Sequence, residues 1–364
     1  MTRMKTQDLL IELIKIPSTS KNQAQVLRAL KFIENYIKEN TTQNLTYSYY
    51  TKNDCHNLII KPESINKPKL TLYSHIDVVD PCSREQFSPI VTEEKIYGRG
   101  AGDMKCGTAI EIHAFLDTIN KQPSASIALM IVGDEEIGGT NGTKFLLSEH
   151  QYKTDCIYMP DSGSGLDTII TDQKGILFLE ITVLGVGGHG SRPHEGENAI
   201  LKAMNLINEM YSFFEKSDPK KYRPTINVSK IEGGKANNQV PDICQFTLDI
   251  RFTDLKLVNQ ILNTLEKKPN VEFQTILFDK NFHIDKSEEV LKLYHKVSED
   301  ILESKVDFRF EHGGSDGRYF QNYNIPCIMT GIKKAHSHGP NEWVDTKELQ
   351  LAEIILKKFI EAFI

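Results

Sequence analysis

The sequence predicts an α/β fold in which a mixed sheet flanked by helices is interrupted by an inserted ferredoxin-like domain. Short apolar strands alternate with helical stretches up to about residue 172, which is typical of a sheet with helices on its faces. Residues 174–283 instead follow the order β-α-β-β-α-β, that of a ferredoxin-like unit. Polar residues of the same kinds follow apolar runs on both sides of this segment, so residues 284–364 are expected to complete the first sheet.

The spacing of apolar residues predicts the individual elements. In residues 1–173, helical spacing predicts helices over Leu9–Ile14, Val26–Ile37 and Ile110–Ile119. Apolar runs predict strands at Leu70–Ser74, Ile127–Val132 and Cys156–Met159, with a further one at Ile325–Met329. In residues 174–283 the expected elements are, in order, strand Leu177–Val183, helix Ala199–Phe214, strands Thr225–Ile231 and Cys244–Arg251, helix Leu257–Leu265 and strand Val271–Leu277.

Length and composition exclude several classes of protein. The chain has 364 residues, which is longer than one hydrophobic core usually serves, so more than one domain is expected. A net charge of −6 argues against a general nucleic-acid binder. No apolar stretch reaches membrane-spanning length, and the start has no signal-peptide core. The six cysteines form no Cys-x-x-Cys pair, so we expect reduced thiols and a cytoplasmic protein.

An acidic segment directly follows the apolar run Ile127–Val132. Asp134, Glu135 and Glu136 are consecutive, and neighbouring carboxylates repel one another unless a cation or protons neutralise them. Taken alone, such a segment is usually an acidic turn in solvent. Similar residues elsewhere in the chain favour a different interpretation.

Residues of metal-ligand type follow several other apolar runs. His75 and Asp77 follow the run at Leu70–Ser74, Asp161 follows Cys156–Met159, and Asp103 follows a glycine-rich stretch. Near the C-terminus, His336 and His338 are both available as ligands. Histidines and carboxylates at strand ends suit divalent ions such as zinc, and a carboxylate can bridge two metals. The sequence therefore predicts a metal site at the edge of the first sheet.

Together these motifs resemble those of the di-zinc aminoacylase and carboxypeptidase family of metallopeptidases. This family includes succinyl-diaminopimelate desuccinylase, acetylornithine deacetylase and glutamate carboxypeptidase. The matching segments are Ser74–Val79, Gly100–Gly107, Asp134–Glu136, Asp161, Gly187–His194 and His338–Glu342, in the family's order and over essentially the whole chain. The resemblance implies a catalytic domain, formed by residues 1–173 and 284–364, and a lid at 174–283 that also mediates dimerisation.

The resemblance also implies roles for the individual residues. Asp103 would bridge two zinc ions, for which cobalt or manganese could substitute. His75 and Asp161 would complete one metal site, and the private ligands of the other would be Glu136 and His338. His338 is selected over His336 because Asn341-Glu342 follows it at the family's spacing. Glu135 would be the general base, and the Asp77 carboxylate would hold the imidazole of His75. The Asp103–Met104 peptide bond is expected to be cis, as in relatives with this motif.

Further residues are expected to contact the substrate. By the resemblance, His189 in the glycine-flanked Gly187–Ser191 segment would stabilise the oxyanion in the partner subunit's active site. Asn238 and Arg251 match positions that bind a substrate carboxylate, and a structural ion pair is the alternative for Arg251. The glycine loop that contains Gly313, Gly314 and Ser315 completes the predicted substrate site.

The implied function is hydrolysis of the amide bond of an N-acyl amino acid, with a metal-bound water as the nucleophile. A zinc dipeptidase or carboxypeptidase that cleaves short peptides is the alternative within the family, and a catalytically silent binding protein is the alternative outside it. The chain departs from the family at Ser74 and Cys106, where glycine is common. Residues 172–175 also lack the extra arginine expected of diaminopimelate desuccinylases. We expect a homodimer that binds neither nucleic acid nor membrane.

Overall fold

The computed structural model describes residues 3–364, which divide into two compact units. The first unit contains the chain up to Thr171, Ile284–Arg309 and Ser315–Ile364. The second contains Asp172–His283 and Phe310–Gly314. The chain therefore leaves the first unit near residue 172, returns to it near residue 284, and contributes a short second segment, Phe310–Gly314, to the second unit.

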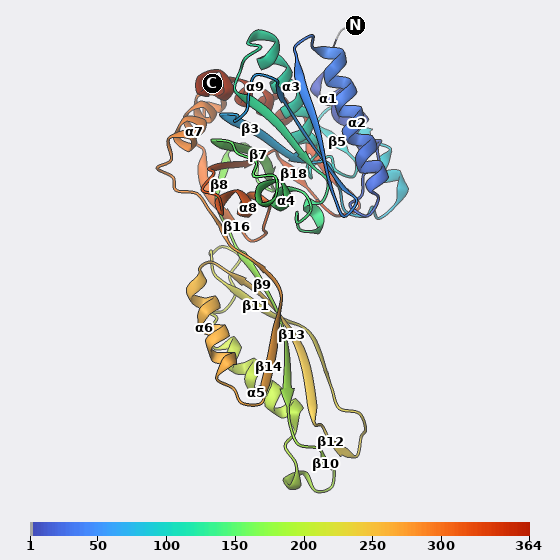
Figure 1. Ribbon diagram of the computed structural model, residues 1–364, viewed down its shortest axis with the longest axis vertical. Helices are drawn as coiled ribbons and strands as arrows, with labels where there is room; N and C mark the ends of the chain where they lie inside the picture. The colour runs from blue at the N-terminus through green and yellow to red at the C-terminus, as the bar shows by residue number, and fades with distance from the viewer. Residues whose placement is uncertain (1–2) are drawn as a thin grey trace. The chain divides into compact units, whose positions relative to one another are not determined.

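A mixed sheet lies at the centre of the first unit (Figure 1). Its strands run in the order β1-β2-β6-β3-β7-β17-β8-β15, with β15 at Phe282–His283, and β16 (Asp307–Glu311) also pairs with β8. Their bounds are Leu45–Lys52 (β1), Cys55–Pro62 (β2), Ile127–Val132 (β6), Leu70–His75 (β3), Cys156–Ser162 (β7), Cys327–Gly331 (β17) and Thr168–Gln173 (β8). The pairings β6–β3, β3–β7 and β7–β17 are parallel, and the outer pairings are antiparallel. The predicted α/β class with a mixed sheet is confirmed.

The central strands are apolar because both faces of the sheet are covered. Every residue of β3 and β6 is buried. Helix α3 packs against β3, β6 and β7, and helices α1 and α9 pack against α3 (Figure 1). The helices of this unit are α1 (Thr6–Ile14), α2 (Gln23–Asn40), α3 (Lys105–Lys121), α4 (Thr143–Ser148), α7 (Glu289–Leu302), α8 (Gly317–Gln321) and α9 (Thr346–Phe363). Short 3-10 helices cover Arg84–Phe87 and Glu135–Ile137.

Polar side chains cap two of these helices. The Asn22 side chain accepts the backbone N–H of Gln25 at the start of α2, and Asp345 accepts the N–H groups of Lys347 and Glu348 at the start of α9. Such caps satisfy backbone donors that have no partner within the helix.

A second, smaller sheet supports the C-terminal histidine segment. Its order is β18-β19-β5-β4, with bounds Lys334–Ala335 (β18), Trp343–Asp345 (β19), Lys95–Tyr97 (β5) and Ile90–Val91 (β4). The β18–β19 pairing is antiparallel and encloses residues 336–342 as a loop. His338 is therefore held on a loop whose two ends are hydrogen-bonded together.

The second unit contains a four-stranded antiparallel sheet in the order β11-β13-β9-β14. The elements are β9 (Gly175–Leu184), α5 (Ala199–Tyr211), β11 (Thr225–Gly233), β13 (Ile243–Phe252), α6 (Leu255–Glu266) and β14 (Val271–Asp279). Alternate residues of β9 are buried, as expected for a sheet with one covered face. Figure 1 shows α5 and α6 on the same side of this sheet, where both contribute to its apolar core. Short strands β10 (Gly188–His189), β12 (Gln239–Val240), β15 (Phe282–His283) and β16 (Asp307–Glu311) complete the element list, with a 3-10 helix at Pro193–Glu195.

Among residues 3–364, no helix combines the length and the apolar character that crossing a membrane requires.

Candidate metal centre

The carboxyl ends of parallel strands bring several proposed ligands to one edge of the mixed sheet. His75 is the last residue of β3, Asp161 lies one residue before the end of β7, and the Glu135–Ile137 turn follows β6. Parallel neighbours end at the same edge, and α/β sheets usually bind ligands there. Asp103 comes from the loop before α3, and His338 comes from the loop between β18 and β19. The Asp103–Met104 peptide bond is cis, which confirms the prediction.

Two groups of ligand atoms share the Asp103 carboxylate. In the first, His75 Nε2 lies 3.5 Å from Asp103 Oδ1 and 3.7 Å from Asp161 Oδ1. In the second, His338 Nε2 lies 3.2 Å from Asp103 Oδ2 and 3.0 Å from Glu136 Oε2. Within each group the ligand atoms all lie within 4.8 Å of one another. The structure thus brings all five proposed ligands together, with Asp103 common to both groups.

These donor sets fit divalent metal ions. Each group offers one imidazole, one private carboxylate and one oxygen of Asp103, and these are ligand types that zinc accepts. His75 Nε2 is buried and has no hydrogen-bond partner among residues 3–364, although it faces the two carboxylates of its group. A buried polar atom without a partner is costly, and an ion bound between these side chains would remove that cost.

The concentration of charge shifts the pKa values of the cluster. Burial would lower the pKa of His75, but Asp103, Asp161 and Asp77 outweigh it and raise that pKa well above its usual range. Hydrogen bonding to Asp103 and to a second carboxylate raises the pKa of His338 to about 10. Burial raises the pKa of Asp161 to about 6. Without metal, protonated histidines therefore balance the carboxylates, and a divalent cation would replace their protons.

Glu135 lies beside the His75 group and belongs to neither group of ligand atoms. Its Oε2 atom is 4.0 Å from His75 Nε2. Burial raises the pKa of Glu135 well above its usual range, the charge of His75 opposes this, and the charge of Asp161 adds to it. A carboxyl group with a raised pKa can accept and return a proton near neutral pH.

Asp77 contacts His75 through both its backbone and its carboxylate. The imidazole Nδ1 lies 3.0 Å from the backbone carbonyl oxygen of Asp77 and 3.5 Å from its carboxylate Oδ1. The closer contact of the ring is therefore with the Asp77 backbone. The buried carboxylate accepts the backbone N–H groups of Glu135 and Glu136 at 3.2 and 3.3 Å, and the Ser20 hydroxyl at 2.7 Å. Asp77 thus connects the end of β3 to the acidic turn.

Glu342 and Arg99 form a buried ion pair that the sequence analysis missed. Glu342 Oε2 lies 2.5 Å from Arg99 Nη1, and Glu342 Oε1 accepts the backbone N–H groups of Gly102 and Asp103, each at 3.0 Å. Arg99 also donates to the carbonyl of Gly339 at 3.3 Å. The pair joins the Asp103 loop to the His338 loop. The His338–Glu342 motif could have indicated this ion pair. In the sequence analysis, however, Glu342 was used only to choose His338 over His336 as the ligand.

The sequence of this chain matches a known family over most of its length. Residues 71–362 match the model of peptidase family M20/M25/M40. The chain belongs to this family. As a member of peptidase family M20/M25/M40 it is a metal-dependent hydrolase, and the clustered carboxylates and histidines are its candidate metal ligands.

The individual relatives compared with this member of family M20/M25/M40 share about a quarter of its residues or fewer. The chain is 26% identical to succinyl-diaminopimelate desuccinylase of Pelagibacter ubique, over 82% of this chain and 83% of that protein. The structure of a tripeptidase from Staphylococcus aureus matches 100% of this chain and 99% of its own with a TM-score of 0.79 at 24% identity. A dinuclear metal-binding M20 peptidase from Bacillus subtilis matches 98% of this chain and 96% of its own with a TM-score of 0.73 at 14% identity. The two structures show that the fold is shared.

In this chain, three of the residues predicted to contact the substrate lie in the second unit. His189, in β10, is exposed, and its Nδ1 lies 2.8 Å from the Ser191 hydroxyl. Asn238 is exposed, and its backbone carbonyl accepts the N–H of Gly190 at 2.7 Å. Arg251, in β13, forms an ion pair with Asp249 through Nε at 2.8 Å and Nη2 at 3.3 Å. The ion pair is the structural alternative that the sequence left open for Arg251, and its substrate role stays a prediction.

The predicted glycine loop crosses from one unit to the other. Gly313 and Gly314 belong to the second unit and are exposed, whereas Ser315 belongs to the first and is buried. The Ser315 hydroxyl accepts the backbone N–H of Gly317 at 3.3 Å, at the start of α8. Its contact within the protein gives Ser315 a structural role, and its substrate role stays a prediction.

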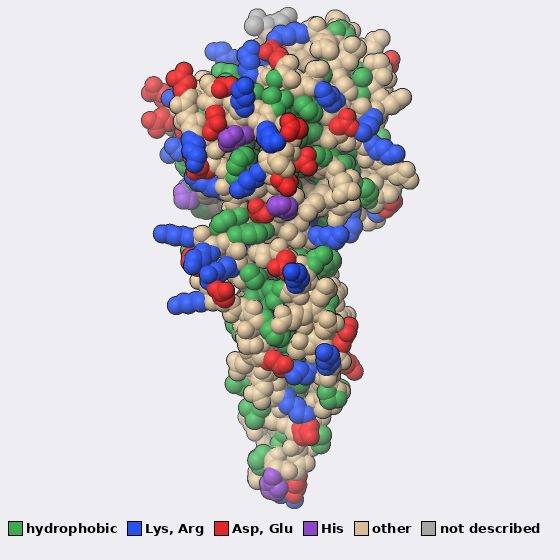
Figure 2. Space-filling view, turned by 90° about the vertical axis from the view of Figure 1, so that its left-hand side faces the viewer, with side chains coloured by type: hydrophobic (Ala, Val, Ile, Leu, Met, Phe, Trp, Pro, Cys, Tyr) green, Lys and Arg blue, Asp and Glu red, His purple; other side chains and the backbone are tan. Residues whose placement is uncertain are grey.

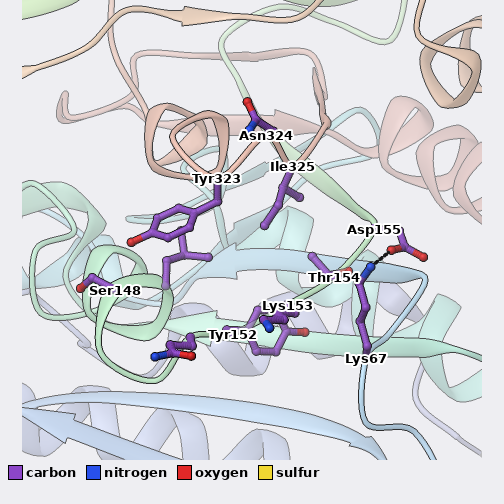
Figure 3. A pocket seen from close by; sticks show the side chains of 11 residues that line it. Lys67, Ser148, Tyr152, Lys153, Thr154, Asp155, Tyr323, Asn324 and Ile325 are labelled. Atoms are coloured by element: carbon purple, nitrogen blue, oxygen red, sulfur yellow. Dashed lines mark ion pairs between the residues drawn. The ribbon is translucent and has the colours of Figure 1, made fainter.

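The opposite edge of the mixed sheet contains a cavity of about 630 Å³. Its lining includes Thr154 and Asp155, which precede β7, and Ile325, which precedes β17. Figure 3 shows Lys67 paired with Asp155 at its rim. None of the predicted metal ligands lines this cavity, so it is separate from the metal centre.

Proposed function

We propose that this protein is a dinuclear zinc hydrolase that cleaves the amide bond of an N-acyl amino acid. The observation that carries the proposal is the Asp103 carboxylate, which is common to two His–carboxylate groups, with Glu135 next to His75 of the first group. The relative named a desuccinylase supports an acylated amino acid as the substrate class.

Each of the two groups of ligand atoms would bind one metal ion. His75 and Asp161 would hold one ion, Glu136 and His338 the other, and Asp103 would contact both. Paired divalent ions lower the pKa of a water molecule and polarise a substrate carbonyl. Glu135 would accept the proton from the attacking water and return it to the leaving amine, since burial raises its pKa. Asp77 would keep Glu135 in reach by holding the backbone of the acidic turn.

A peptidase acting on short peptides is the second candidate. The structural relative named a tripeptidase matches all of this chain, which favours this alternative. Residues 172–175 have no arginine, so within the first candidate we favour acyl amino acids other than succinyl-diaminopimelate.

For the second unit we propose an inserted ferredoxin-like domain that acts as a lid and dimerises. Its β9-α5-β11-β13-α6-β14 order supports the assignment. Exposed apolar side chains support dimerisation: Ile231 on edge strand β11 is 53% exposed, and Leu201 and Met204 on α5 are 57% and 50% exposed. Figure 2 shows hydrophobic side chains at the surface of this unit among charged ones. In such a dimer, the partner subunit's His189 would stabilise the oxyanion. The six thiols, all unpaired in the structure, support our proposal of a cytoplasmic location.

The test is turnover by protein loaded with zinc, cobalt or manganese. N-acetyl and N-succinyl amino acids form one arm of the panel, and dipeptides and tripeptides form the other. We expect hydrolysis in the first arm and its loss in Glu135→Gln with both metals retained. Cleavage confined to peptides would replace the first candidate by the second. Failure of the metal-loaded protein on both arms would support a silent binding protein.

A further inference from the structure

The turn that carries Glu135 is held at its far end by two side chains of α8. The backbone carbonyl of Gly138 accepts a hydrogen bond from the Tyr319 hydroxyl at 2.6 Å and another from Arg318 Nη2 at 3.1 Å. Tyr319 is 3% exposed and Arg318 is 6% exposed, so both donors are buried, and Gly138 itself is half-buried. A carbonyl that accepts two buried donors, one of them charged, is strongly fixed in place.

The glycine after this carbonyl lets α8 approach the turn. Gly139 has a φ of +64°, and a Cβ atom there would collide with the Asp316 carboxylate. Asp316 in turn accepts the Tyr73 hydroxyl at 2.6 Å and the Thr143 hydroxyl at 2.5 Å. Tyr73 lies in β3, two residues before His75. The start of α8 is therefore tied to the strand that carries a proposed ligand as well as to the turn.

The two ends of the turn have separate attachments. At the start, the Asp77 carboxylate accepts the N–H groups of Glu135 and Glu136. At the finish, Tyr319 and Arg318 donate to the carbonyl of Gly138. Between these attachments, the Glu135 side chain has to stay within reach of the water whose proton it is proposed to accept. Small displacements of a catalytic group lower reaction rates strongly.

We propose that Tyr319 and Arg318 are positioning residues that hold the Glu135 turn in the geometry needed for proton transfer. The proposal rests on the proposed role of Glu135. Neither side chain belongs to the two ligand groups, so their effect should be on the proton-transfer geometry, with little effect on metal retention.

The first test is Tyr319→Phe, which keeps the ring and removes the hydroxyl donor to Gly138. We expect kcat to fall about 10- to 100-fold, with KM and metal content within about twofold of wild type. Arg318→Lys should have a similar effect, because an ammonium cannot reproduce the planar guanidinium contacts. The matched control is Tyr36→Phe, which removes another buried hydroxyl, the partner of His113 Nε2 at 3.1 Å, from a different part of the unit.

A second measurement does not depend on activity. Hydrogen–deuterium exchange of the peptide covering residues 134–139 should be faster in Tyr319→Phe than in wild type and unchanged in Tyr36→Phe. If wild type hydrolyses its substrate but Tyr319→Phe keeps full kcat, or the peptide exchanges as in wild type, the positioning role is wrong. If wild type hydrolyses nothing, the proposed function fails. In that case, exchange of residues 134–139 that is the same in Tyr319→Phe as in wild type would also show that Tyr319 does not hold the turn.

Discussion

The Asp77 carboxylate accepts the backbone N–H of Glu135 at 3.2 Å. Its second oxygen accepts the N–H of Glu136 at 3.3 Å. One buried side chain therefore fixes the backbone of the proposed base and of a proposed ligand. Glu135 and Glu136 start from the same fixed turn, so the different directions of their side chains decide their proposed roles. Glu136 reaches the His338 group, and Glu135 is left to exchange protons.

The two adjacent glutamates should respond oppositely to substitution. Glu135→Gln should lower kcat by about 10²–10⁴-fold and keep the full metal content, because it removes a proton acceptor and no ligand. Glu136→Gln should release metal, because it removes a proposed ligand that belongs to the His338 group alone. Metal analysis after dialysis, combined with initial rates, separates the two. Metal loss from Glu135→Gln with retention in Glu136→Gln would reverse the assignment.

Asp77→Asn should weaken metal binding about 10- to 100-fold and lower kcat. An asparagine can accept only through its carbonyl oxygen, so its NH₂ group would face one of the backbone donors that the carboxylate now accepts. Metal titration measures the effect. Asp80→Asn, which changes an exposed carboxylate paired with exposed Lys21, is the matched control. Equal metal affinity in the two variants would contradict the role given to Asp77.

Glu353 should make the first unit sensitive to acid. Burial would raise the pKa of Glu353, but hydrogen bonds to His113, Lys357 and Thr6 outweigh it and lower the pKa to about 2. A carboxyl whose pKa is lower in the folded state stabilises the fold above its unfolded pKa of about 4.5, and this stabilisation disappears as the pH falls toward 2. Allowing for partial exposure, we expect a contribution of about 1–3 kcal/mol to the free energy of unfolding.

Denaturant unfolding at pH 6 and pH 3 checks the Glu353 prediction. Glu353→Gln should be less stable than wild type at pH 6, and the difference should shrink at pH 3. Glu63→Gln, at an exposed position, should show no such change with pH. A constant difference between wild type and Glu353→Gln at the two pH values would exclude the lowered pKa.

The proposed dimer predicts complementation between two inactive variants. His189→Ala lacks the proposed oxyanion donor and Glu135→Gln lacks the proposed base. In a mixed dimer, one site would contain an intact Glu135 together with the partner subunit's His189, so part of the activity should return. Mass measurement must show that subunits have exchanged. Exchange without recovery of activity would mean that His189 does not serve a neighbouring subunit.

The sequence was most informative where function depends on local motifs. His75, Asp161 and the acidic turn each follow an apolar run, and this shared pattern of ligand-type residues predicted a metal site at the edge of the sheet. The Glu342 contacts with Asp103 could not be predicted in this way, because the two residues lie on separate loops joined only in the folded chain. The Tyr319–Gly138 bond is similar, since neither residue has a ligand-type side chain. The carbonyl contact of His75 was missed because motif reasoning considers side chains, whereas this acceptor belongs to the backbone.

The position of β17 has a consequence for how the protein is made. In the mixed sheet this late strand lies between β7 and β8, which are synthesised much earlier. A ribosome that has completed β8 has already incorporated the proposed ligands of one group, His75, Asp103 and Asp161, but the sheet still lacks an interior strand and His338 has not yet been synthesised. The nascent chain therefore has at most half a metal centre, and premature termination before β17 should yield products that neither close the sheet nor hold a second ion.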